Sequence, residues 1–187
     1  MVRAFNISVM RILSRSAWLL AGLGGLWAAT LVQLSLTAMV TQSTSIERAK
    51  VVSSWAAASG PVIYTHYKLQ ITEQFKGPAI TEIEVFGGAV NGRVQTYAGA
   101  PQFNAGDDYV FFLYSNKAGL TYITGLTQGL FQIPANSGSD PTVTRSASRE
   151  RMLDPVTGNQ IKDSTLTMTL SALRSQIAST LGSGAAQ

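Results

Sequence analysis

The sequence predicts a mainly β fold, either an all-β barrel or a Greek-key sandwich with small helical additions. Short apolar or alternating segments follow one another along most of the chain, glycines separate them, and only two stretches have helical periodicity. A length of 187 residues with 45% hydrophobic content can bury one core, though not comfortably two. We therefore expect a single domain over residues 30–182 and a disordered tail at 183–187.

Residues 1–29 have the composition of a secretory signal peptide. The basic residues Arg3, Arg11 and Arg15 precede an uncharged apolar block at 17–29. As a helix this block would reach about 20 Å, which is short of the ~30 Å hydrocarbon core of a membrane. Its length therefore favours a signal peptide over a membrane span.

An uncleaved N-terminal anchor is the alternative. The apolar run continues to Val40, which is long enough to span a membrane with the arginines inside, although polar residues at 33, 35 and 37 interrupt it. No clean cleavage motif is present, since Trp27 stands two residues before Ala29. Both interpretations export the body to the periplasm or the extracellular space, and the second anchors it to the inner membrane through residues 17–40.

Charge and cysteine content narrow the classes of partner. The formal charge is +4, and removing the first fifteen residues, with three arginines and no acidic residue, lowers it to +1. A nearly neutral body argues against a nucleic-acid partner, which normally meets a strongly basic face. The chain has no cysteine, so it has neither a disulfide nor a lipoprotein anchor.

The first elements of the body are a short helix and a strand. Residues 34–43 predict a helix with Ser35 as its N-cap and with apolar residues spaced as on one helical face, at Leu36, Met39 and Val40. Residues 45–55 predict a first strand. The small residues at 56–61 end in Gly-Pro and predict a loop.

Residues 62–75 alternate clearly and predict a long strand with one buried and one wet side. The buried side is expected to carry Ile63, Thr65, Tyr67, Leu69 and Ile71. The wet side is expected to carry Tyr64, His66, Lys68 and Gln70.

Glycines divide the middle of the chain. Residues 76–78 predict a turn, 79–88 a strand and 93–99 a weak strand. Residues 107–114 are apolar on both faces after their first two positions, which is typical of a strand buried on both sides.

The remaining segments are shorter, and a helix closes the domain. Strands are expected within 120–126, 128–133 and 142–148, and a turn at 153–160. Residues 169–180 predict a helix, in which Thr169 is the cap and Gly182 marks the end. Its apolar face is formed by Leu170, Leu173, Ile177 and Leu181.

Three segments carry a resemblance to a known group of proteins. They are YTHYKLQITEQFKG (64–77), GAPQFNAGDDYVFFL (99–113) and GLTQGLF (125–131). The shared landmarks are a Tyr-Thr opening of a long strand, a Lys-Gly turn at its end and a Gly-x-x-Tyr turn into an apolar strand. In these landmarks the chain resembles a group of secreted bacterial proteins of unassigned function, and the resemblance covers about residues 30–180. Their body is similar to the netrin-type, or tissue-inhibitor-of-metalloproteinase-like, OB barrel.

The resemblance implies an OB-like closed or partly open β-barrel with a short N-terminal helix and a C-terminal helix. It implies no catalytic residues, because its motifs are structural. Eukaryotic inhibitors with this fold bind the zinc of their target through an N-terminal cysteine, and this sequence has no cysteine. That inhibitory mechanism therefore does not carry over.

Two adjacent carboxylates, Asp107 and Asp108, precede the apolar strand and raise the possibility of a catalytic acid pair. Asn104 and Gly106 beside them give the segment the composition of a tight turn. Neighbouring residues of a strand also point to opposite faces, whereas an acid pair must converge on one substrate. We therefore interpret both aspartates as scaffold.

His66 is the only histidine, and no constellation around it is evident from spacing. A Ser-His-Asp mechanism needs an activated serine, and no G-x-S-x-G motif occurs. Zinc is usually held by three or four ligands drawn largely from His and Cys, so we expect no structural zinc site. The sequence thus predicts neither catalytic residues nor a metal or cofactor site.

Three other polar patterns have simpler interpretations. The glycine-rich segment 87–92 lacks the G-K-[ST] ending of a phosphate loop and is expected to be a loop between strands. Glu82 and Glu84 suggest an exposed acidic strand face, because no calcium-binding loop motif joins them to Asp140, Asp154 and Asp163. The basic residues Arg145, Arg149 and Arg151, with Glu150 among them, suggest a solvated face.

Two classes of function remain. The first and preferred one is an exported, non-catalytic binding module for a protein, peptide or glycan, with Tyr64, His66, Tyr97 and Tyr122 as candidate contact residues. Protease inhibition through a surface loop is a variant of it. The second is an extracytoplasmic hydrolase that uses His66 with a carboxylate.

Overall fold

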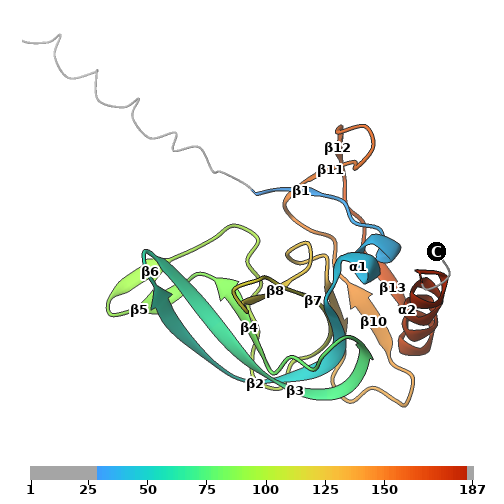
Figure 1. Cartoon of the computed structure of the whole chain (residues 1–187), viewed down its shortest axis with the longest axis horizontal. Helices are drawn as coiled ribbons and strands as arrows, with labels where there is room; N and C mark the ends of the chain where they lie inside the picture. Colours follow the sequence, from blue (N-terminus) through green and yellow to red (C-terminus); the bar gives the residue numbers. More distant parts are fainter. Residues whose placement is uncertain (1–28, 185–187) are drawn as a thin grey trace, which may run out of the picture.

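A computed structural model describes residues 29–184. The fold is mainly β, with one large antiparallel sheet and two helices, which confirms the predicted fold class at that level (Figure 1). The predicted signal peptide at 1–29 lies outside the described residues except for its last position, and of the alternative anchor at 17–40 only residues 29–40 are described. Within residues 29–184, no helix combines the length and the apolar character that crossing a membrane requires.

Seven strands form the path of the large sheet, in the order β13-β10-β9-β7-β2-β3-β4, and β8 pairs with β7 beside this path. Among the described strands β4 pairs only with β3, and β8 only with β7, so no backbone ladder closes the sheet into a ring. The bounds are β2 Ser45–Ser59, β3 Val62–Lys76, β4 Glu82–Phe86, β7 Asp108–Ser115, β8 Thr121–Ile123, β9 Leu130–Ile133, β10 Thr142–Arg145 and β13 Leu166–Thr169.

The β2–β3 hairpin is the longest feature of the sheet. It runs from the side of the helices to the opposite end of the molecule (Figure 1). The sequence predicted a first strand that ends at residue 55 and a loop at 56–61, and both predictions are wrong. The small residues Ala56, Ala57 and Ala58 pair with β3, and the chain reverses only at Gly60, whose φ is +59°. Three register shifts between the strands allow the hairpin to coil.

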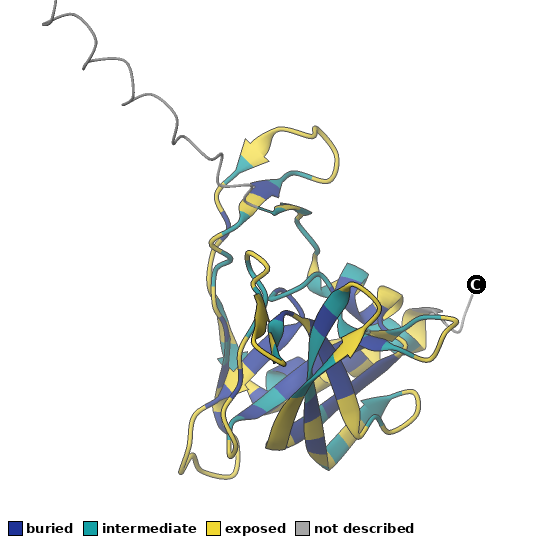
Figure 2. Ribbon diagram, turned by 90° about the vertical axis from the view of Figure 1, so that its left-hand side faces the viewer, coloured by how far each residue is buried: buried dark blue, intermediate teal, exposed yellow. Residues whose placement is uncertain are grey.

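Two small sheets complete the β structure. In the first, β1 (Thr30–Val32) runs parallel to β11 (Arg151–Leu153), and β11 pairs with β12 (Gln160–Ile161). This sheet projects from the main body (Figure 2). The second is a hairpin of β5 (Gly88–Val90) and β6 (Arg93–Gln95), so the loop predicted at 87–92 is in part a strand.

Both helices begin where the capping residues predict. In α1 (Leu36–Gln42) the Ser35 Oγ accepts a hydrogen bond of 3.1 Å from the Ala38 N–H. In α2 (Leu170–Gly184) the Thr169 Oγ1 accepts one of 3.1 Å from the Ala172 N–H. The second helix continues two residues beyond Gly182, where the sequence predicted its end.

The large sheet has a hydrophobic core on each side, and β7 contributes to both. Phe111 and Phe112 are both fully buried and, as neighbours in a strand, point to opposite sides. We name the core that contains both helices the helix core; its members include Met39, Val40, Ile46, Phe112, Phe131, Leu173 and Ile177. We name the other the sheet core; its members include Val51, Tyr67, Leu69, Ile83, Val85, Phe103, Phe111 and Leu113.

Candidate functional site

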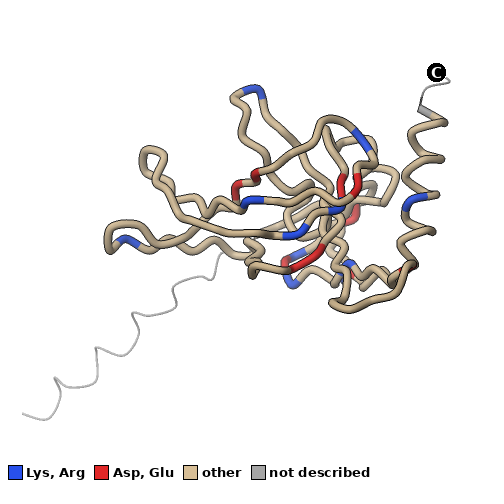
Figure 3. The backbone as a smooth tube through the Cα atoms, turned by 90° about the horizontal axis from the view of Figure 1, so that it is seen from below, with Lys and Arg blue, Asp and Glu red and all other residues tan. Residues whose placement is uncertain are grey.

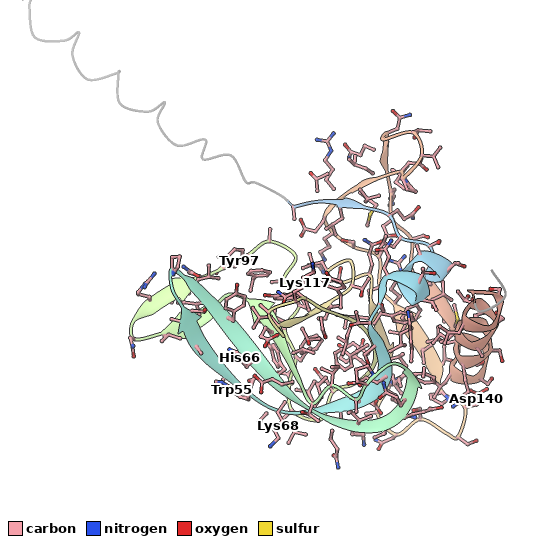
Figure 4. All side chains as sticks on the ribbon, viewed as in Figure 1. Trp55, His66, Lys68, Tyr97, Lys117 and Asp140 are labelled. Carbon is pink, nitrogen blue, oxygen red and sulfur yellow. The ribbon has the colours of Figure 1, made fainter. Side chains whose placement is uncertain are left out.

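The four contact residues predicted from the sequence lie in one region of the surface. Tyr64 and His66 alternate along β3 with the buried residues Ile63 and Tyr67, so they project from the other side of the strand. In the register with β4, Tyr64 lies opposite Phe86 and His66 opposite Glu84. Figure 4 labels His66 and Tyr97 among the side chains of this end of the molecule.

Phe86 is the centre of an aromatic cluster that was not predicted from the sequence. Its ring centroid lies 5.0 Å from that of Tyr64, 5.3 Å from that of Tyr97 and 5.6 Å from that of Tyr122. The Tyr122 ring is nearly parallel to it, at 4°. These separations are typical of interacting aromatic pairs. The three tyrosines predicted as contact residues therefore converge on a phenylalanine that comes from the edge strand β4.

Trp55 extends this cluster along the hairpin. It lies opposite His66 in the β2–β3 register, and the two rings stack with centroids 5.2 Å apart and planes 6° apart. The labelled side chains in Figure 4 show Trp55 and His66 side by side. We name the surface formed by Trp55, Tyr64, Phe86, Tyr97 and Tyr122 the aromatic face. A single strand pattern could not reveal it, because its members come from β2, β3, β4, β8 and the segment after β6.

His66 also contacts an acidic side chain. Its Nδ1 lies 2.8 Å from the Glu82 Oε1. The hairpin register places Glu82 opposite Lys68, two pairs along from the His66–Glu84 pair and on the same face of the strands. The expected hairpin about the 76–78 turn could have indicated this proximity, but the turn length that sets the register is not readable from the residues alone.

Glu84 is buried, which contradicts the exposed acidic face expected from the sequence. Its side chain turns toward β8, where the Glu84 Oε2 accepts a hydrogen bond of 2.7 Å from the Thr121 N–H. The alternation within β4 could not predict this, since a strand distant in sequence covers that side of Glu84. Burial raises the pKa of the Glu84 carboxyl, and the Thr121 hydrogen bond opposes the shift in part.

The phenol of Tyr122 is held in its neutral form. Burial, assisted by the neighbouring Tyr64 hydroxyl, raises its pKa to about 12. Tyr122 therefore offers a protonated hydroxyl and an apolar ring at any ordinary pH.

The Asp107–Asp108 pair forms a turn and a strand contact, as interpreted from the sequence. The Asp107 Oδ2 accepts a hydrogen bond of 2.8 Å from the Asn104 N–H and closes the turn. The Asp108 carboxylate instead accepts two hydrogen bonds from Arg48, of 2.7 and 3.2 Å. The two carboxylates thus have separate partners and do not converge.

The basic cluster expected to be a solvated face is only partly one. Arg149 and Arg151 are exposed, but Arg145 is buried and forms two hydrogen bonds of 2.9 Å with Asp163. This pair is not evident from the sequence, because eighteen positions separate its members and a loop brings them together. Elsewhere acidic and basic positions are interspersed over the molecule as seen in Figure 3.

The other aspartates considered for calcium serve separate local structures. Asp140 accepts hydrogen bonds from the Ser171 N–H and hydroxyl at the start of α2. Asp154 accepts from the Val156 and Thr157 N–H groups in a turn. Among residues 29–184, the side chains that could hold a metal ion together are His66, Glu82 and Glu84, whose ligand atoms all lie within 4.8 Å of one another.

Comparisons of the chain with protein-family models, with curated proteins and with solved structures found no match.

Proposed function

We propose that the protein is an exported, non-catalytic binding module that holds a protein partner on its aromatic face. One observation carries the proposal: five aromatic side chains from distant parts of the chain assemble on a single surface and stay partly exposed. The exposed fractions are 44% for Trp55, 39% for Phe86 and 41% for Tyr97. An exposed cluster of large apolar side chains marks an interaction site more often than it marks ordinary surface.

The chemistry of the surface favours a protein over other ligands. Trp and Tyr dominate the energetic centres of protein interfaces, where they fill pockets and keep a polar group for hydrogen bonding. Phe86 lies among the tyrosines and offers only an apolar ring, which suits an apolar partner side chain. The nearby Lys68 and Glu82 are exposed and provide both signs of charge at the rim.

The rings are already ordered by one another, which favours binding further. Tyr122 is parallel to Phe86, and Trp55 is parallel to His66. Side chains fixed before association lose less conformational entropy when the partner binds.

We also propose an OB-like, partly open barrel of the netrin-type kind as the finer description of the fold. Support comes from two side-chain bridges between β4 and β8: the Glu84 hydrogen bond to Thr121 and the stacking of Phe86 on Tyr122. The basic and apolar composition of residues 1–29 supports export, to the periplasm or the extracellular space.

Site-specific photo-crosslinking in intact cells tests the binding proposal. A photoreactive phenylalanine analogue replaces Trp55 or Tyr97 in the full chain, and Val156 serves as the control position because it is 90% exposed and lies in the turn between β11 and β12. We expect both face positions to give the same discrete protein adduct and position 156 to give none. Absence of an adduct at both face positions, or equal adducts at all three, would refute the proposal.

A hydrolase remains the second candidate, because the structure brings His66 within 2.8 Å of a carboxylate oxygen of Glu82. A carboxylate that orients an imidazole is one part of a general-base mechanism. Purified wild-type and His66→Ala proteins should be assayed on ester, amide and glycoside substrates. Turnover that falls at least a hundredfold in the variant would support this candidate, and turnover equal in both proteins would remove it.

Protease inhibition is a variant of the binding proposal, in which the partner is a secreted protease. An adduct with a protease in the crosslinking experiment, together with slower cleavage of a peptide substrate by that protease, would favour it. If the identified partner has no protease activity, the inhibitory variant is excluded and the binding proposal stands.

A further inference from the structure

We propose that His66, Glu82 and Glu84 form a binding site for a divalent transition-metal ion at the edge of the aromatic face. The three residues occupy adjoining positions of two paired strands: His66 on β3 lies directly opposite Glu84 on β4, and Glu82 is two residues before Glu84. One ligand atom from each lies within 4.8 Å of the other two. The site is independent of the proposed partner-binding function.

The burial of Glu84 points to a ligand. Its side chain belongs to a residue only 9% exposed, and one of its oxygens lies within 4.8 Å of an oxygen of Glu82, whose side chain is 44% exposed. A buried carboxylate is poorly solvated and is repelled by a second carboxylate beside it, and a cation that binds both removes these costs. The Thr121 N–H fixes the Glu84 Oε2, while a carboxylate has lone pairs for about four partners. Glu84 can therefore keep this hydrogen bond and still coordinate an ion.

The His66–Glu82 contact already brings two of the ligands together. The Nδ1 and Oε1 atoms are 2.8 Å apart, a hydrogen-bond distance, so a proton lies between them in the metal-free protein. A metal ion bound to both side chains would replace that proton, and water would fill the coordination positions that the three side chains leave open.

The ligand set selects the class of metal. Imidazole nitrogen suits Zn²⁺, Ni²⁺ and Co²⁺, whereas Ca²⁺ and Mg²⁺ prefer sites made only of oxygen. One imidazole and two carboxylates are thus suited to a first-row transition ion. This departs from the expectation that no metal site exists, because the spacing of the residues could not show that His66 lies beside Glu82 and Glu84.

The stacking of Trp55 on His66 supplies both rigidity and a signal. The ring planes are 6° apart, so the indole limits rotation of the imidazole about its own axis. Paramagnetic Co²⁺ or Ni²⁺ bound at His66 would lie close enough to quench the fluorescence of Trp55. The other two tryptophans, Trp18 and Trp27, lie in the N-terminal segment, and a Trp55→Phe variant separates their emission from that of Trp55.

Metal titration of the full chain tests the proposal. The purified protein is stripped with a chelator and titrated with CoCl₂, NiCl₂ or ZnCl₂, and binding is followed by calorimetry and by tryptophan fluorescence. We expect one ion per chain and, with Co²⁺ or Ni²⁺, quenching that disappears in Trp55→Phe although this variant still binds. Changing a ligand should weaken binding at least about tenfold, in both His66→Ala and Glu82→Gln.

Glu73→Gln is the matched control, because Glu73 is on the same strand β3 but contacts Arg174 and is not among the three ligands. It should bind as the wild type does. Glu82 is exposed, so Glu82→Gln should leave the fold intact. This variant therefore tests the proposal even if His66→Ala fails to fold. Binding that is absent in the wild type, or that is unchanged in both ligand variants, would overturn the proposal.

Discussion

At the scale of single residues, the buried ionisable groups carry the clearest consequences. Glu47 on β2 is fully buried, and its Oε2 accepts a hydrogen bond of 3.0 Å from the Ile80 N–H. The other oxygen, Oε1, has no hydrogen-bond partner among the described residues. Burial raises the pKa of this carboxyl, because the charged form is poorly solvated there, and the hydrogen bonds from Ile80 and Ser45 oppose the shift only in part.

We expect Glu47 to make the protein less stable as the pH rises. An acid whose pKa is higher in the folded than in the unfolded state adds to the unfolding free energy. This contribution is complete at a pH below the unfolded-state pKa, near 4.5, and is lost as the pH rises through the raised folded-state pKa. Glu47→Gln removes this titration. Urea unfolding between pH 4 and pH 8 should show a smaller pH-dependent loss of unfolding free energy in the variant. Parallel curves for the two proteins would contradict this expectation.

The Arg145–Asp163 pair should behave in the opposite way. Burial alone would raise the pKa of Asp163, but the hydrogen bonds from Arg145 and Ser148 outweigh it and lower the pKa to about 2. The stability that Asp163 contributes is present at a pH above its unfolded-state pKa, near 3.8, and is lost only as the pH falls toward 2. Asp163→Asn leaves a buried guanidinium unpaired, which should cost about 3–5 kcal/mol of unfolding free energy.

Glu73→Gln is a suitable comparison for this measurement. It breaks the ion pair of Glu73 with Arg174, in which both side chains are partly exposed. Exposed pairs contribute at most about 1 kcal/mol. If chemical denaturation at pH 7 finds equal losses in Asp163→Asn and Glu73→Gln, the buried pair does not have the stabilising role assigned to it.

At the scale of elements, the turn that joins β3 to β4 depends on one glycine. Gly77 has φ +67°, and a Cβ atom at this position would lie 2.0 Å from the backbone oxygen of Thr44. Gly60, in the β2–β3 turn, has a similar φ of +59°, but a Cβ atom there would meet nothing within 4 Å. Alanine substitutions at the two positions therefore distinguish the cost of backbone strain alone, at Gly60, from the cost of strain together with a steric clash, at Gly77.

We expect Gly60→Ala to cost about 1–2 kcal/mol, the ordinary cost of a left-handed conformation for a residue with a Cβ atom. Gly77→Ala should cost clearly more, because the turn must also move away from Thr44. Thermal unfolding of both variants measures the difference. A Gly77→Ala protein as stable as Gly60→Ala would show that the turn shifts freely, contrary to the packing described above.

The elements also show how far the sequence could predict this fold. The period-two pattern at 62–75 predicted β3 and its two faces, because one side of that strand packs against a core and the other meets solvent or other side chains. The caps at Ser35 and Thr169 predicted the helix starts, since their hydrogen bonds are local. Local patterns of this kind are readable without knowledge of the rest of the chain.

Elements and contacts that depend on distant partners were missed. The strand β1 consists of three residues held by β11, about 120 positions away, and no local pattern distinguishes it. The burial of Glu84 depends on β8, and the burial of Arg145 depends on Asp163. Tyr64, Tyr97 and Tyr122 were named singly as candidate contact residues, but their convergence on Phe86 becomes evident only from the fold, in which the register of β3 and β4 places Phe86 opposite Tyr64.

At the scale of the whole molecule, one sheet joins two cores. The helix core and the sheet core share β2 and β7, so the loss of packing on one side should destabilise the other. We expect Leu173→Ala in α2 and Leu69→Ala in β3 each to lower the unfolding free energy by about 2–5 kcal/mol.

Unfolding of both variants should remain a single transition. Far-ultraviolet and near-ultraviolet circular dichroism report backbone and aromatic packing, and their midpoints should coincide in each variant. A Leu173→Ala protein in which one signal is lost at a lower urea concentration than the other would show instead that the two cores unfold independently.

The contact between β4 and β8 relies on side chains where neighbouring strands elsewhere in the sheet are held by backbone ladders. Amide protons along this line lack the continuous hydrogen bonding that slows their exchange with deuterium, so local opening should begin there. Phe86 and Tyr122 stand on opposite sides of the line. A partner that covers both rings would hold the two edges together and suppress this local opening. Binding should therefore slow deuterium uptake by β4 and β8 relative to the free protein.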